Sequence, residues 1–176
     1  YAYERNRKYA FPFAKLCDMS TKLVEIAYPS NNIELGVNID IFPLDYFDDN
    51  FGEAKKEIRR IRKNNACLSY MKVDKPKTNN PFRYIAWSLI IKYCKLRGSR
   101  HYIQKVNKEC NKPWQKGSRY AGAKVWPIWG ERVITPSDAF AEAIEIEFEG
   151  SMFPAPIGYD AYLTCLYGDY LPEPPK

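Results

Sequence analysis

The first fifty residues carry the two-residue alternation of apolar and polar side chains that is typical of β-strands. The pattern predicts extended segments at Tyr1–Leu16, Thr21–Ile26 and Gly36–Leu44, the last two joined by a turn at Tyr28–Asn32. In the third segment the side chains of Val37, Ile39 and Ile41 share one face of the strand. Asn38 and Asp40 fall on the other face, so this strand is apolar on one side and polar on the other.

The pattern then changes to the three- to four-residue period of amphipathic helices. Asn50 and Glu53 have the spacing of a capping box and predict the start of a helix, whose apolar stripe includes Ile58 and Ile61. Ser99 is the expected cap of a shorter helix further along the chain. Both helices present a basic surface opposite their apolar stripe.

The helix expected between these two, from its cap Asn80 to Gly98, has a broader apolar surface. Its apolar side chains recur on one side at helical spacing, and others widen that side: Phe82, Ile85, Leu89, Tyr93 and Leu96, with Trp87, Ile90 and Ile91. A core helix is the interpretation that we favour. The alternative is a helix on a membrane surface, because Lys92 and Lys95 accompany its aromatic side chains.

The C-terminal third predicts one more strand and one more helix. Apolar residues alternate with glutamates over Ile144–Phe148, and a short helix is expected at Tyr159–Tyr167, closed by Gly168. This order of strands and helices, without an internal repeat, predicts the α+β class. The chain has 176 residues, of which 45% are apolar, which is enough for a single domain over residues 1–176 with one core.

Charge is distributed unevenly along the chain, whose net charge is +6. Residues 54–119 hold 19 basic and 3 acidic side chains, whereas the segments before and after them have net charges of −4 and −6. A basic helical region of this kind is typical of a surface that meets nucleotides, phosphorylated glycans or anionic lipids. Solvated helix faces would produce the same pattern, and charge alone leaves both interpretations open.

Motif content excludes several classes of protein. The chain has no P-loop, no dinucleotide-binding glycine motif, no G-x-S-x-G and no H-E-x-x-H, and no aromatic RNA-binding motif, so no nucleic-acid partner is expected. His101 is the single histidine, which argues against a histidine-rich metal site. The five cysteines include no C-x-x-C pair, which predicts free thiols in a reducing compartment. The apolar runs are too short to span a membrane.

Asp40 is the leading candidate for chemistry. An aspartate on a covered strand face is costly unless a cation or a hydrogen bond pairs it, and carboxylates of this type hold Mg²⁺ in phosphoryl transfer. Spacing alone favours the simpler interpretation, a solvated aspartate. Asp48 and Asp49 are better explained by the turn and cap before the helix. Lys15 could bind a phosphate as a point charge, or be merely solvated.

Three ordered motifs resemble the LicD family of phosphotransferases, spanning about residue 9 to 174. They are Phe11-Pro12-Phe13-Ala14-Lys15-Leu16 with Asp18 and Thr21, the phrase Ile39-Asp40-Ile41-Phe42-Pro43-Leu44-Asp45, and a series from Gly130-Glu131 to Tyr167-Gly168-Asp169-Tyr170. The resemblance implies a nucleotidyltransferase-like mixed sheet with a basic helical insertion, related to fukutin-type proteins. It also implies transfer of phosphorylcholine or a related phospho-alcohol from CDP-choline or a similar CDP-linked donor to a cell-surface glycan, with Mg²⁺ or Mn²⁺ as cofactor.

The resemblance also implies roles for individual residues. Asp40 matches the apolar-acid-apolar strand position and is the expected catalytic and metal-binding residue. The expected substrate-binding residues, whose individual roles stay unassigned, are Lys15, Asp45, Tyr167 and Asp169. The Asp-rich motif that supplies two further metal ligands in that family does not occur in residues 1–176. We therefore expect this chain to be the C-terminal part of a longer catalytic domain.

Two functional hypotheses follow. In the first, the parent protein is a cytoplasmic transferase that modifies the cell envelope, such as lipopolysaccharide or teichoic acid, with peripheral contact at the inner face of the membrane. In the second, the chain is a non-catalytic basic module that binds anionic membrane or phosphorylated glycan. An Asp-rich motif upstream of Tyr1 in the parent gene would favour the first.

Overall fold

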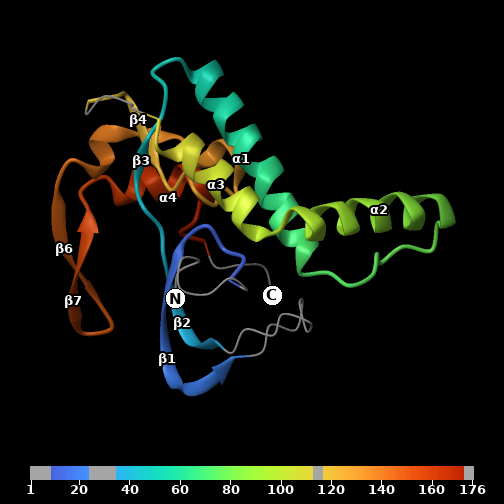
Figure 1. Cartoon of the computed structure of the whole chain (residues 1–176). Coiled ribbons are helices and arrows are strands. Elements are labelled where there is room, and N and C mark those ends of the chain that lie inside the picture. Colours follow the sequence, from blue (N-terminus) through green and yellow to red (C-terminus); the bar gives the residue numbers. More distant parts are fainter. Residues whose placement is uncertain (1–8, 24–34, 113–116, 173–176) are drawn as a thin grey trace.

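Figure 1 shows the computed structural model, which describes residues 9–23, 35–112 and 117–172. The helices are α1 (Phe51–Met71), α2 (Pro81–Arg97), α3 (Ser99–Cys110) and α4 (Tyr159–Tyr167), with two 3₁₀ turns, η1 (Gly130–Val133) and η2 (Ser137–Phe140). The strands are β1 (Ala14–Leu23), β2 (Leu35–Ile41), β3 (Asp45–Tyr46), β4 (Tyr120–Gly122), β5 (Thr135–Pro136), β6 (Ala143–Phe148) and β7 (Ser151–Pro156).

The α+β class is confirmed. Within the described residues the strands form three separate antiparallel sheets, β1–β2, β3–β4–β5 and β6–β7, rather than one mixed sheet. The β1–β2 and β6–β7 pairs extend away from the helices as hairpins, while the short central sheet lies beside α1 (Figure 1). The core therefore depends mainly on helix packing.

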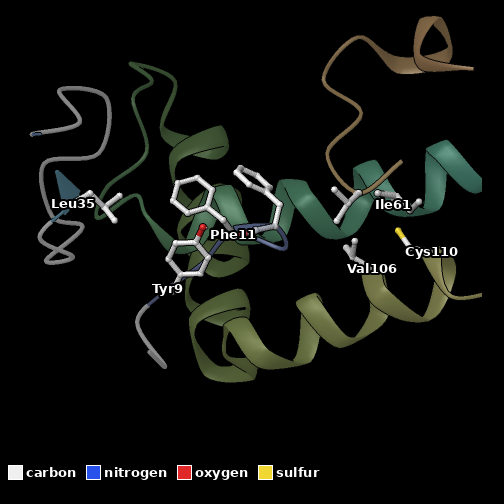
Figure 2. Close-up of a cluster of buried hydrophobic side chains, with 8 residues drawn as sticks. Tyr9, Phe11, Leu35, Ile61, Val106 and Cys110 are labelled. Atoms are coloured by element: carbon white, nitrogen blue, oxygen red, sulfur yellow. Dashed lines mark hydrogen bonds between the residues drawn. The ribbon is translucent and has the colours of Figure 1, made fainter. Parts of the chain in front are cut away.

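The largest buried cluster lies where α1 packs along α3. Figure 2 shows Ile61 of α1 close to Val106 and Cys110 of α3, with Tyr9 and Phe11 in the same cluster. The Tyr9 hydroxyl donates a hydrogen bond to the Phe13 carbonyl at 2.7 Å, which holds this aromatic segment in a tight bend. The prediction of an extended Tyr1–Leu16 is therefore wrong over residues 9–13, because these aromatic side chains are buried in the core; residues 1–8 lie outside the described residues.

Asn50 caps α1 as the sequence predicts. Its side-chain oxygen accepts hydrogen bonds from the backbone N–H groups of Gly52 at 2.9 Å and Glu53 at 3.3 Å. The other half of the capping box is replaced, because the Asn50 N–H bonds to Asp48 and the Glu53 carboxylate pairs with Lys56. The predicted stripe is buried at Ala54, Ile58 and Ile61, while Phe51 at its start stays exposed.

The β1–β2 hairpin pairs different residues from those predicted. The strand begins at Ala14 instead of Thr21, and the partners of β2 are Ala14–Asp18 and, after a register shift, Leu23. The predicted turn at Tyr28–Asn32 and the end of the predicted strand at 24–26 lie outside the described residues. The strand starts earlier than predicted because the buried aromatic segment ends at Phe13, so that β1 begins at the next residue.

Two C-terminal features differ in how well they were predicted. α4 and its closing glycine, Gly168 with φ +76°, are as predicted, and so is β6. β7 was not predicted, because Pro154 and Pro156 suppress a strand assignment. It forms nonetheless through a two-residue turn in which Glu149 and Gly150 both have positive φ, 50° and 75°. Such a turn matches the twist of a hairpin. In the described residues β7 pairs with β6 on one side only, so its prolines, which lack a backbone N–H, leave no donor missing on the other side.

The prediction that α2 is a core helix is wrong. It projects away from the α1–α3 pair (Figure 1), and of its side chains only Ile91 and Cys94 are buried. Its cap residues are as predicted, with Asn80 accepting from the Arg83 N–H at 3.1 Å and Gly98 at φ +78°. α3 begins at Ser99 itself, with Gly98 in the cap position.

The five cysteines are free thiols, as the sequence predicts. Cys67 of α1 is partly buried, and burial followed by its hydrogen bond with Cys94 of α2 raises its pKa to about 11. A thiol with so high a pKa stays protonated at neutral pH and is a poor nucleophile. The Cys67 thiol therefore serves packing rather than nucleophilic chemistry. No helix in the described part of the chain is both long and apolar enough to cross a bilayer.

Candidate functional site

Asp40 lies directly opposite Lys15 across the β1–β2 hairpin. The Lys15 ammonium donates to a carboxylate oxygen of Asp40, and also to the side-chain carbonyl of Asn38 at 3.1 Å. Because cross-strand partners share a face, all three side chains lie on the polar side of the hairpin. The simpler interpretation, a solvated aspartate, is therefore incomplete, because Asp40 is exposed but is also paired, with Lys15 as the cation.

Lys15 is almost completely buried, with 8% of its surface exposed, so its charge needs more than one partner. Its ammonium lies 4.7 Å from the centre of the Phe11 ring and 5.3 Å from that of Phe13. Aromatic faces attract cations, and the attraction is stronger where water is excluded. The bend at residues 9–13 therefore has a direct consequence for the site, because it supplies the two rings that hold Lys15.

The carboxylate of Asp40 stays accessible despite this ion pair. Its side chain keeps 37% exposure, against 7% for that of Lys15, so the lysine approaches from the interior and the aspartate faces outward. A hydroxyl group arriving from solvent can reach the carboxylate, and an anionic group can reach the positive field of the buried ammonium beside it. The arrangement therefore presents one exposed carboxylate held against a buried ammonium.

The described residues do not by themselves fit a metal centre. Asp40 is one carboxylate and is already paired with Lys15. Across residues 9–23, 35–112 and 117–172, no group of three or more His, Cys, Asp or Glu side chains is placed to bind a metal ion. Mg²⁺ and Mn²⁺ prefer several oxygen ligands. The requirement for either ion thus stays a prediction of the family resemblance.

Asp45 lies at the start of β3 and is half-buried. Burial raises the pKa of its carboxyl group, while the Lys124 ammonium acts in the opposite direction. Lys124 is fully buried, pairs with Glu57 at 2.7 Å and donates to the Tyr46 carbonyl at 3.1 Å. These contacts join α1 to the short central sheet, so the surroundings of Asp45 are those of a structural ion cluster.

Tyr167 and Asp169 lie at the end of α4, which packs on η1, η2 and β5. The Tyr167 ring meets the Trp129 ring edge-on, with 5.1 Å between their centres. Asp169 follows Gly168 and is exposed. Of the predicted site residues, the contacts of the described chain bring together Lys15 and Asp40, whereas Tyr167 and Asp169 are held by a different part of the fold.

Sequence reasoning missed one component of the site and one separate feature of the surface. Asn38 was recognised as polar but not as a partner of Lys15, although its two-residue spacing from Asp40 was a usable signal. An open groove of about 280 Å³ was also missed; it is lined by Leu44, Phe140, Ala141, Glu142, Ala143, Pro154, Ala155 and Pro156. The groove begins at Leu44 in the second motif and needs β7, which the sequence did not predict.

Comparisons with known proteins add no relative. No family model matches the chain, and no curated protein or solved structure matches it at a significant level. The resemblance to the LicD family therefore depends on the motif residues alone.

Proposed function

We propose that this chain is part of a phosphotransferase that moves phosphorylcholine, or a related phospho-alcohol, from a CDP-linked donor to a cell-surface glycan. The observation that carries the proposal is the Lys15–Asp40 pair, in which the lysine is buried and the aspartate is exposed. Lys15 belongs to the first motif that resembles the LicD family and Asp40 to the second, 25 residues later, and the hairpin puts them in contact.

The chemistry assigned to these side chains is limited and specific. The acceptor hydroxyl oxygen attacks the phosphorus that carries the choline, a new P–O bond forms, and the bond to the bridging oxygen of the diphosphate breaks. CMP leaves with that electron pair. The exposed carboxylate of Asp40 accepts the hydroxyl proton, and Lys15 orients the carboxylate while its charge attracts the phosphate.

A nucleotidyltransferase-like sheet is part of the same proposal. The outer face of the β1–β2 hairpin is apolar and open, and its large exposed side chains include Leu16, Val37, Ile39 and Ile41. A sheet normally buries an apolar face against another layer. Two strands that leave such a face open therefore resemble part of a larger layered sheet. The proposal therefore expects this face to be covered in the complete catalytic domain.

The test is transferase activity of the full-length parent protein with CDP-choline, a divalent cation and the glycan acceptor. The variant Asp40→Asn keeps the size of the side chain but removes the proton acceptor, and we expect turnover to fall by roughly a hundredfold or more. Asp74→Asn is the matched control, because Asp74 is exposed and its ion-pair partner is Lys95, which is not part of the Lys15–Asp40 site. Unchanged turnover in Asp40→Asn would show the assignment of Asp40 to be wrong.

A second measurement identifies the donor. Thermal unfolding of the chain with a series of CDP-linked alcohols and Mg²⁺ should show the largest rise in melting temperature for the true head group, since ligands stabilise the state that binds them. Lys15→Met should abolish the rise. A rise of the same size in Lys15→Met would contradict the role of Lys15 in donor binding.

A further inference from the structure

Five large apolar side chains form a continuous line along α2 and point into solvent. They are Phe82, Ile85, Leu89, Tyr93 and Leu96, and their exposed fractions range from 54% at Tyr93 to 85% at Leu96. Spacings of three and four residues place them within an arc of roughly 80° on the helix. We call these five residues the α2 stripe.

The α2 stripe lies on the opposite side of the helix from its contacts with the body of the protein. Ile91 and Cys94, the buried residues of α2, point toward α1 and α3. Figure 1 shows the helix projecting from that pair, so the α2 stripe lies along a protruding edge. Large apolar surfaces rarely stay in water without a partner.

Basic side chains border the α2 stripe on both sides. At 100° per residue, Lys92 falls about 20° outside one edge of the α2 stripe and Arg97 about 40° outside the other, and α2 contains no acidic residue. The Arg97 guanidinium lies 5.4 Å from the centre of the Tyr93 ring. Long basic side chains of this kind can keep their charge at a polar boundary while their stems follow apolar neighbours.

We propose that α2 docks on an anionic membrane surface. The α2 stripe enters the boundary between headgroups and acyl chains, and Lys92 and Arg97 beside it reach the lipid phosphates. Tyr93, within the α2 stripe, is of a type that favours this boundary. The proposal does not depend on the transferase function, because it uses none of the residues of the Lys15–Asp40 site.

Charge favours a membrane over a second copy of the chain. Two α2 stripes placed face to face would bring four cationic side chains together, Lys92 and Arg97 of each copy, and α2 offers no carboxylate to pair with them. An anionic lipid surface instead supplies a phosphate for each. The same basic residues that oppose self-association therefore favour the bilayer.

The test is flotation of the chain with vesicles. We expect the chain to float with phosphatidylcholine vesicles in which roughly one lipid in three is phosphatidylglycerol, and to float much less with phosphatidylcholine alone. The triple variant Phe82→Ser, Leu89→Ser, Leu96→Ser should lower the bound fraction by about tenfold or more. Lys92→Gln with Arg97→Gln should weaken binding and reduce its loss on adding salt.

A matched triple variant controls for the loss of exposed apolar surface in general. Ile128→Ser, Phe148→Ser and Met152→Ser remove side chains of similar exposure outside α2, and this variant should float like the unmodified chain. Unfolding temperatures of both triples should stay close to that of the unmodified chain, because none of the substituted residues is buried.

Several outcomes would overturn the proposal. Absence of flotation would do so, as would equal flotation of the α2 triple and its control. A concentration-dependent dimer that the α2 triple abolishes would identify a second copy as the true occupant. Asp40→Asn should float like the unmodified chain, so failure of membrane docking and failure of the transferase proposal are distinguishable.

Discussion

α2 and α3 are neighbours in the chain, separated by Gly98, and each carries an apolar stripe at helical spacing. The stripe of α3 is buried throughout, at Tyr102, Ile103, Val106 and Cys110. That of α2 is exposed throughout. The difference arises because α3 lies along α1, whereas α2 contacts the body through Ile91 and Cys94. Periodicity thus predicts that a helix has an apolar face, but the chain fold decides whether another part of the protein covers it.

The same contrast holds for charged pairs. Glu57 of α1 and Lys124 form a buried pair at 2.7 Å, with both side chains nearly inaccessible. Lys95 of α2 pairs with Asp74 at 3.2 Å where both are exposed. Solvent screens the Lys95–Asp74 pair and cannot reach the Glu57–Lys124 pair. Removing one partner should therefore lower the free energy of unfolding much more in the buried pair than in the exposed pair.

The largest expected effect comes from breaking the buried pair. Lys124→Met leaves the Glu57 carboxylate in the interior with only Lys112 at 3.5 Å, and it removes the donor to the Tyr46 carbonyl. We expect the free energy of unfolding to fall by about 3–5 kcal/mol. Lys95→Met should change it by less than about 1 kcal/mol. Urea unfolding followed by circular dichroism measures both, and equal losses would contradict the contrast between the two regions.

The next effect concerns the stripes themselves. Ile103→Ala should lower the free energy of unfolding by about 2–5 kcal/mol, because Ile103 is fully buried and the change leaves a cavity between α3 and its neighbours. Leu96→Ala in α2 should be within about 0.5 kcal/mol of zero. A large loss in Leu96→Ala would mean that some part of the protein covers the α2 stripe.

The sequence predicted helices better than it predicted strands. The ends of α1, α2 and α4 follow from local signals, the caps Asn50 and Asn80 and the glycines Gly98 and Gly168. β7 was missed because its prolines argue against a strand, and only pairing with β6 on one side makes them acceptable. β1 was placed too late because the burial of Phe11 and Phe13 in the helical core is a long-range contact.

The candidate site was predictable only in part. Asp40 and Lys15 were both singled out from their motifs, and the strand alternation placed Asn38 and Asp40 on one face. Their contact was not predictable, because the register of β1 against β2 depends on where β1 begins. The two rings around Lys15 were also beyond prediction, since residues 9–13 looked like part of a strand.

Removing the N-cap residues of α1 and α2 should show the same difference between the two helices, with a smaller effect on the free energy of unfolding. Asn50→Ala removes the acceptor for two backbone N–H groups of α1 and should lower the free energy of unfolding by about 1 kcal/mol. Asn80→Ala removes one such bond from α2 and should act locally, because little of α2 is buried in the core. Amide hydrogen exchange should show faster exchange across the first turns of α2 in Asn80→Ala, with global stability almost unchanged. Global unfolding that is equally sensitive to both caps would mean that α2 is part of the cooperative core.

The smallest effect depends on pH and concerns the ion pairs that join α3 to α1. Burial raises the pKa of Glu109, but hydrogen bonds from Lys112 at 2.6 Å and Arg60 at 3.0 Å outweigh it, and the pKa lies below its ordinary value of 4.5. A carboxyl group whose pKa is lowered on folding stabilises the protein above the unfolded pKa, and this contribution is lost as the pH falls through the folded value. Glu109→Gln should therefore lower stability by about 1 kcal/mol or less at neutral pH. The difference from the unmodified protein should shrink below pH 4.5 and vanish once Glu109 is protonated in the folded state. Urea unfolding of both proteins across the acid range measures this difference, and a difference that stays constant below pH 4.5 would contradict the role of Glu109.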